Sequence, residues 1–98
     1  MNKPNVGDIL VGRYSYNSII YTFYKVQKVT ESTVTLAELR KFGEGNYNGG
    51  NYYVHPGHEI VGHSFVKRFS KNKDYIKKGY EYIRPWDGSE CVELHGMD

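Results

Sequence analysis

The sequence is poor in several residue types: it has one cysteine, two methionines and almost no alanine, and it contains no long apolar run. A single cysteine excludes an intrachain disulfide, and with it the small secreted folds that disulfides hold together. A transmembrane helix needs about 18–20 consecutive apolar residues, and no segment approaches that length. The first residues also lack the apolar core of a signal peptide. We therefore expect a soluble protein of the cytoplasm.

The residues that are abundant favour strands. The chain has 98 residues, enough for a single domain over residues 1–98 with one modest core. Aromatic residues make up 15% of it and include ten tyrosines. Tyrosine and β-branched residues favour strands, whereas eleven glycines and the scarcity of alanine disfavour long helices. The composition therefore predicts an all-β fold.

Segments rich in β-branched and aromatic residues, separated by turn residues, predict about five strands. The two strands on either side of Glu31-Ser32 should form an antiparallel hairpin, because so short a connection allows no other pairing. Five short antiparallel strands on a chain of this length predict a small, strongly bent barrel of the SH3-like or OB-like kind. The expected strands cover residues 9–14, 17–30, 31–40, 59–69 and 75–86.

The segment "KFGEGNYNGGNYYV", residues 41–54, contains four glycines and three asparagines. This composition predicts a long Gly/Asn/Tyr loop over residues 43–53 that carries Tyr47, Tyr52 and Tyr53. Pro56-Gly57 predicts a turn after the loop. A loop this long in a small domain is either mobile or functional.

Three short segments, "VGDILVGRYSY", "TFYKVQKVTESTVTLAEL" and "YIRPWDG", occur in this order along the chain. Together they resemble a family of small, mostly uncharacterised proteins of bacteriophages and related mobile elements. Where that family usually has Trp-Gly-Tyr and a following Gln-Thr-Asn, this chain has "RYSYNSII". The resemblance implies a phage or mobile-element origin and action inside a bacterial host, and it implies no particular activity. The matching positions are Gly7 to Ile9, Phe23, Tyr24, Val26, Val29, Thr30, Thr33 to Leu36, and Pro85 to Gly88.

The stretch "YVHPGHEIVGH" has the composition of a zinc site. Two ligands of a catalytic zinc usually lie one turn apart on a helix, but Gly62 and the β-rich surroundings disfavour a helix. On a strand, His58 and His63 would point to opposite faces because they are five residues apart. Only His55 and His58 then remain as a pair, across the predicted turn. We expect no metal site and no cofactor.

Catalytic patterns are also weak. Cys91 and His95 lie in an acidic tail, and no basic residue adjoins the thiol to lower its pKa. "FGEGNYNGG" lacks the Lys-Ser/Thr and the helix of a phosphate-binding loop. The sequence therefore predicts a protein that is not an enzyme and assigns no role to Cys91. Trp86 is expected to fold back onto the core, with Asp87-Gly88 as the turn.

Charge is unevenly distributed, although the net charge is only +2. Residues 65–84 contain seven Lys/Arg and two Asp/Glu, a net of +5, whereas residues 87–98 contain four Asp/Glu and no Lys/Arg, a net of −4. Nucleic-acid-binding barrels combine cations for phosphates with aromatic rings for bases. We therefore predict nucleic-acid contacts by Lys67, Arg68, Lys71, Lys73, Lys77, Lys78, Tyr47, Tyr52, Tyr53 and Tyr75.

Two other kinds of partner fit the same residues. The Tyr-rich loop and the acidic tail would suit an inhibitor or adaptor that binds a host protein, for example a host defence or nucleic-acid-processing enzyme. Tyrosine gives such a surface a large, rigid contact area at low entropic cost. A small nucleotide held between the loop aromatics is a third hypothesis. The sequence does not distinguish among the three, and it does not give the oligomeric state.

Overall fold

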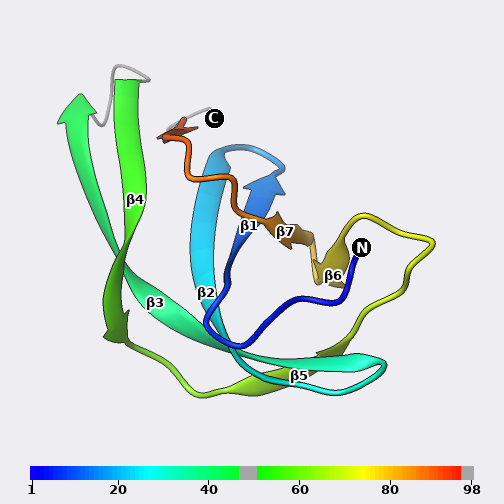
Figure 1. Cartoon of the computed structure of the whole chain (residues 1–98). Helices are drawn as coiled ribbons and strands as arrows, with labels where there is room; N and C mark the ends of the chain where they lie inside the picture. Colours follow the sequence, from blue (N-terminus) through cyan, green and yellow to red (C-terminus); the bar gives the residue numbers. More distant parts are fainter. Residues whose placement is uncertain (47–50, 96–98) are drawn as a thin grey trace.

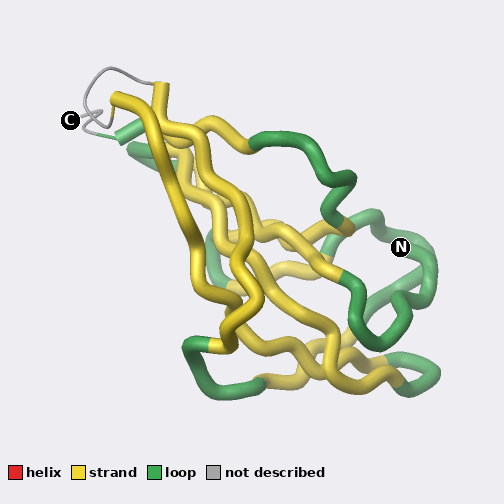
Figure 2. Tube along the Cα trace, turned by 60° about the vertical axis from the view of Figure 1, so that its left-hand side comes forward, coloured by secondary structure: helices red, strands yellow, loops and turns green. Residues whose placement is uncertain are grey.

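The computed structural model describes residues 1–46 and 51–95, and all regular structure within these ranges is β. Figure 2 shows strands along most of the trace, with loops in the shorter stretches between them. No helix that could span a membrane occurs in the described part of the chain. The strands are β1 (Ile9–Ser15), β2 (Ile19–Val29), β3 (Thr33–Asn46), β4 (Asn51–Ile60), β5 (Phe65–Arg68), β6 (Ile76–Lys78), β7 (Glu81–Pro85) and β8 (Cys91–Glu93).

The eight strands form one antiparallel sheet in the order β6-β7-β1-β2-β3-β4-β8, and β5 pairs with the first half of β3. The prediction of an all-β, antiparallel fold is confirmed. The sheet is not closed, because no ladder joins β6, at one end of the strand order, to β5 or to β8 in the described ranges. It also has eight strands where about five were predicted. Figure 1 shows the β3–β4 hairpin at one end of the molecule and β6 at the other.

Strand β3 bends the sheet, because its two halves have different partners. Its first half pairs with β2 and β5, and its second half pairs with β4. The β3–β4 register shifts between Leu39 and Lys41, and the β2–β3 register shifts between Val26 and Lys28. Such irregularities bend a strand and increase its local twist. The bend lets the sheet cover two separate apolar clusters.

These two clusters lie on opposite faces of β1 and β2, since side chains alternate along a strand. Leu10 and Tyr24 belong to one cluster, while Phe23 belongs to the other. Strands that are buried on both faces tend to be continuously apolar, which fits the adjacent, buried Phe23 and Tyr24 of β2. The first core consists of Met1, Leu10, Tyr24, Val26, Val34, Leu36, Ile76 and Ile83. The second core consists of Phe23, Leu39, Val54 and Cys91.

The predicted loop over residues 43–53 is wrong for the described residues, because β3 continues to Asn46 and β4 begins at Asn51. In this hairpin Gly45 pairs with Tyr52 and Gly43 pairs with Val54. A Cβ on Gly43 would lie 2.3 Å from the Tyr52 ring. At this position glycine makes room for a ring on a neighbouring strand rather than providing a flexible loop.

Three other predicted boundaries are also corrected. Pro56-Gly57 lies inside β4 and is not a turn, and the Phe42 ring covers Gly57. The expected strand over residues 59–69 is divided, because β4 ends at Ile60 and β5 begins at Phe65. The expected strand over residues 75–86 is a hairpin, β6–β7, and its turn contains Gly79 at φ +62°.

The segment after β7 follows its prediction. Trp86 is half-buried against the second core and meets the Phe23 ring edge-on, with 5.7 Å between centroids. The Trp86 indole N–H donates to the Ser89 carbonyl at 2.9 Å, and the Ser89 N–H donates to the Asp87 carboxylate at 2.9 Å. Gly88, at φ +88°, completes the turn. Strand β8, which follows, was not predicted.

Candidate nucleic-acid interface

The β6–β7 hairpin has one buried and one exposed face. Ile76 pairs with Ile83, and both side chains are buried in the first core. Lys77 pairs with Tyr82, one residue further along each strand. Because strand side chains alternate, Lys77 and Tyr82 point away from the core. The hairpin therefore presents a side to solvent on which a lysine and a tyrosine are neighbours.

On this exposed side, cations and aromatic rings alternate. The Tyr75 and Tyr82 rings meet edge to face, with 5.0 Å between centroids. The Arg84 guanidinium carbon lies 5.6 Å from the Tyr75 centroid and 6.0 Å from the Tyr82 centroid. The ammonium nitrogens of Lys73 and Lys77 lie 5.9 Å and 5.8 Å from the Tyr75 and Tyr82 centroids. All these distances are within cation–π range. We call these five residues the cation–ring face.

The charges around the cation–ring face are mostly positive. Arg13, an exposed residue of β1, is the register partner of Tyr82. Asp74 lies 3.8 Å from the Arg84 guanidinium, and both side chains are largely exposed. An exposed ion pair of this length contributes about 0–1 kcal/mol, so a phosphate can displace Asp74 from Arg84 at little cost. The face therefore keeps an excess of positive charge.

A groove of about 410 Å³ adjoins this face, between the residues that follow β5 and the start of β6. Arg68, Lys73 and Lys77 contribute cations to its lining, while Phe69 and Ile76 contribute apolar surface. Of the predicted contact residues, the structure thus brings together Lys73, Tyr75 and Lys77 on the face and Arg68 in the groove beside it.

The other predicted lysines lie elsewhere. Lys78 points to the opposite side of β6, and its ammonium lies 5.3 Å from the centroid of Phe65. Lys67 is half-buried on β5, and Lys71 is exposed in the turn that follows. These three residues do not belong to the cation–ring face. Two residues that do belong to it, Tyr82 and Arg84, were missed, although both alternate with the buried Ile83 and so could have been placed together.

Two of the predicted tyrosine contacts, Tyr52 and Tyr53, are not brought to the basic segment. Tyr52 and Tyr53 lie on β4, at the end of the sheet opposite β6 (Figure 1). Tyr52 is half-buried over Gly43 and meets the His95 ring edge-on at 6.0 Å. Tyr53 is exposed and is the register partner of Val92. Tyr47 lies outside the described residues.

The predicted acidic tail is partly internal. Glu93, on β8, is only 1% exposed. Its carboxylate accepts hydrogen bonds from the Lys41 ammonium at 2.6 Å and from the Tyr21 N–H at 2.9 Å, and it lies 2.9 Å from the His95 ring nitrogen. Burial alone would raise the pKa of Glu93, but these three partners outweigh it and hold the pKa below its usual range. Glu93 is therefore not available to a partner.

The remaining candidate groups are dispersed. Burial raises the pKa of the Cys91 thiol, and the carboxylates of Asp87 and Glu93 raise it further. His55 stacks on Phe42 with 5.8 Å between centroids, His58 is exposed on β4, and His63 follows β4 rather than sharing its strand. Across residues 1–46 and 51–95, no three His, Cys, Asp or Glu side chains are grouped so that they could hold a metal ion.

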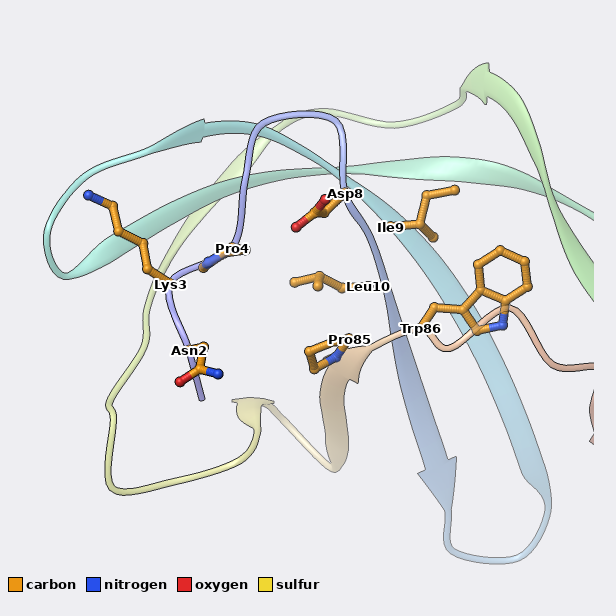
Figure 3. A pocket seen from close by; sticks show the side chains of 8 residues that line it. All are labelled: Asn2, Lys3, Pro4, Asp8, Ile9, Leu10, Pro85 and Trp86. Carbon is orange, nitrogen blue, oxygen red and sulfur yellow. The ribbon is translucent and has the colours of Figure 1, made fainter.

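A hollow of about 310 Å³ lies between the N-terminal residues and the β1–β7 pair (Figure 3). Pro4, Leu10 and Pro85 form apolar walls, and the Asp8 side chain lies among them (Figure 3). One oxygen of Asp8 accepts the Asn5 N–H at 2.9 Å, so this carboxylate serves the local turn. Lys3 is the other charged residue among the described residues that line the hollow, and its ammonium pairs with Glu31 at 3.3 Å.

Comparisons of the chain with models of protein families, with curated proteins and with solved structures found no match.

Proposed function

We propose that the protein acts by binding nucleic acid through the cation–ring face, without catalysing a reaction. One observation carries this proposal: three cations and two paired tyrosine rings lie together on the exposed side of the β6–β7 hairpin. Each cation is less than 6 Å from the centroid of a tyrosine ring. Cations bind phosphates, and tyrosine rings stack on bases. The origin in a phage or mobile element, proposed from the resemblance, fits this function.

The rings also prepare the cations for binding. A long, exposed lysine or arginine side chain loses up to about 2 kcal/mol of rotamer entropy when a ligand fixes it. Contact with a tyrosine ring already restricts part of this freedom, so less is lost on binding. Small bent barrels of the OB-like kind, some of them only partly closed, bind oligonucleotides on one exposed sheet face. We propose the same use for this open sheet.

The test measures fluorescence anisotropy of labelled DNA and RNA oligonucleotides over a salt series. We expect Lys77→Ala and Arg84→Ala each to weaken binding and to reduce the slope of log affinity against log salt by about 0.7–0.9, the value for one lost phosphate contact. Lys28→Ala is the matched control, because Lys28 is an exposed lysine on β2 outside the cation–ring face. The proposal is lost when no oligonucleotide binds at about 50 mM salt, where phosphate contacts are strongest.

A protein partner is the second candidate, and a different surface favours it. On the outward side of β3, β4 and β8, the exposed side chains of Phe42, Tyr53 and Val92 lie close together, because Tyr53 pairs with Val92 and Phe42 pairs with His55. Exposed aromatic residues are enriched at protein interfaces. This surface includes Tyr53 of the predicted loop and Val92 of the predicted acidic tail, and it adds Phe42.

The two candidates separate in a pull-down from bacterial lysate after nuclease treatment. If the partner is a protein, the parent chain should capture it from the treated lysate. The Phe42→Ser/Tyr53→Ser variant should no longer capture it, whereas the Lys77→Ala/Arg84→Ala variant should still do so. Capture that disappears on nuclease treatment, or that depends only on Lys77 and Arg84, would instead favour nucleic acid.

A further inference from the structure

Two exposed tyrosines stack on each other next to the cation–ring face. Tyr16 is 74% exposed and Tyr80 is 75% exposed. Their ring centroids are 6.2 Å apart and their planes are inclined by 28°. Tyr16 lies in the turn between β1 and β2, and Tyr80 lies in the turn between β6 and β7. Two separate turns therefore combine to present a small aromatic platform to solvent.

A pocket of about 260 Å³ opens beside Tyr16. Ile19 and Leu94 form apolar parts of its lining, and their backbones are joined by two hydrogen bonds of 3.0 Å. Ser15, Asn17 and Ser18 add two hydroxyls and an amide, and none of the described residues that line the pocket is charged. An apolar lining with a few neutral hydrogen-bonding groups suits a flat, uncharged ring with polar edges. A nucleobase is such a ring.

The platform adjoins the cation–ring face along β7. Tyr80 immediately precedes this strand, and Tyr82 follows two residues later, so their Cα atoms are at most about 7 Å apart. On the neighbouring strand, β1 leads from Arg13, the partner of Tyr82, to the turn that carries Tyr16. A nucleic acid whose phosphates lie on the cation–ring face would thus reach the platform with an adjacent nucleotide.

We infer that Tyr16, Tyr80 and the adjoining pocket form a base-binding subsite for single-stranded nucleic acid. One unpaired base stacks on the platform and places its polar edge against Asn17 and the two serines, while neighbouring phosphates lie on the cation–ring face. In a duplex, every base is stacked on its neighbours and paired, so none is free to enter without unstacking. The protein then prefers single strands over duplex. This inference rests on the proposed function.

The experiment compares three labelled probes of about 12 nucleotides: a single strand, an abasic strand with the same phosphates, and a duplex. We expect the single strand to bind at least about fivefold more tightly than the abasic strand, since stacking of one base contributes about 1–3 kcal/mol. Tyr16→Ala/Tyr80→Ala should reduce this difference to the part that Tyr75 and Tyr82 contribute, and it should leave the salt dependence unchanged. Tyr16→Phe/Tyr80→Phe should retain the difference, because it keeps both rings.

Two variants control for general effects. Tyr53→Ala removes an exposed tyrosine from β4 and should leave all three affinities unchanged. Asn17→Ala keeps the platform and removes one polar group of the pocket, so it should reduce the preference for one base over another while stacking persists. All variants should melt at the temperature of the parent protein, because the altered side chains are exposed.

The outcomes separate this inference from the proposed function. When single and abasic strands bind equally well and with the same salt dependence, the base-binding subsite is refuted and nucleic-acid binding stands. When neither strand binds at about 50 mM salt, the proposed function fails. Titration with free adenosine and thymidine, followed by NMR shifts of residues 15–19 and 94, then decides the pocket: shifts support a base pocket, and unchanged signals refute it.

Discussion

The two halves of the bent sheet each hold one inward-pointing carboxylate, and the two carboxylates have different partners. Glu81, on β7, lies beside the first core and accepts a hydrogen bond of 2.5 Å from the Tyr24 hydroxyl. Glu93, on β8, lies beside the second core and is bound by the Lys41 ammonium. Glu81 keeps part of its surface in water, whereas Glu93 has almost none.

Exposure explains the difference. A carboxylate that keeps some contact with water needs only a neutral donor on its inner side. One that is removed from water needs a cation and further hydrogen bonds to offset its desolvation. Glu81 also affects Tyr24, its hydrogen-bond donor. Burial raises the pKa of Tyr24 well above its ordinary value, and the hydrogen bond to Glu81 and the negative charge of Glu81 raise it further. Tyr24 therefore stays protonated and remains the donor.

The largest expected effect comes from removing Glu93. Glu93→Ala leaves Lys41 and His95 without their shared carboxylate, and we expect the free energy of unfolding to fall by about 3 kcal/mol. This lies at the low end for a broken buried pair, because the Lys41 side chain is 30% exposed and can reach water. Urea denaturation measures the change. Glu90→Ala, at an exposed position of the same segment, should change stability by less than about 0.5 kcal/mol. Equal losses in the two variants would contradict the burial argument.

A smaller loss is expected at Gly12, which makes room for Glu81. A Cβ on Gly12 would lie 2.1 Å from a Glu81 carboxylate oxygen, so Gly12→Ala displaces the acceptor of Tyr24. We expect a destabilisation of about 1–3 kcal/mol, as for other overpacked sites. Gly62→Ala is the matched control, because its Cβ would meet only an ordinary contact at 3.7 Å. Thermal melts of both variants test this, and an unchanged Gly12→Ala protein would show that Glu81 moves freely.

The smallest expected effect is a change in acid sensitivity. The folded protein holds the pKa of Glu93 below its unfolded value of about 4.3. The stabilisation is therefore complete above that value and is lost as the pH falls through the folded pKa. We expect the free energy of unfolding of Glu93→Gln to fall less steeply below about pH 4.3 than that of the parent. Denaturation curves from neutral to acidic pH measure the two slopes, and identical slopes would exclude this role.

Local sequence predicted the elements whose partners are close along the chain. The β2–β3 hairpin follows its predicted turn, since Thr30 and Thr33 join across Glu31-Ser32. The Asp87-Gly88 turn also forms as expected, since the Ser89 N–H donates to the Asp87 carboxylate. The basic segment was also located, and part of it forms the cation–ring face. Each of these features depends on residue type and on contacts within a short stretch.

The failures involve contacts across the sheet that residue type alone does not specify. Composition predicts a loop at residues 43–53, but whether a glycine provides flexibility or space for a ring depends on what lies across from it, as Tyr52 does for Gly43. The return of β8 to pair with β4 buries Glu93, and nothing in the surrounding acidic residues distinguishes Glu93 from exposed Glu90. Tyr82 and Tyr52 have the same chemistry in sequence and lie at opposite ends of the sheet.

The sequence by itself thus determined an all-β chain, the turns at Glu31-Ser32 and Asp87-Gly88, and the concentration of positive charge in residues 65–84. Only the tertiary structure decided which face of each strand is covered, which tyrosines meet cations, and that Tyr16 and Tyr80 come together. The physical reason is that alternation along a strand defines two faces without saying which one is buried. That choice depends on the register and bend of β3, which brings strands from both ends of the chain onto one sheet.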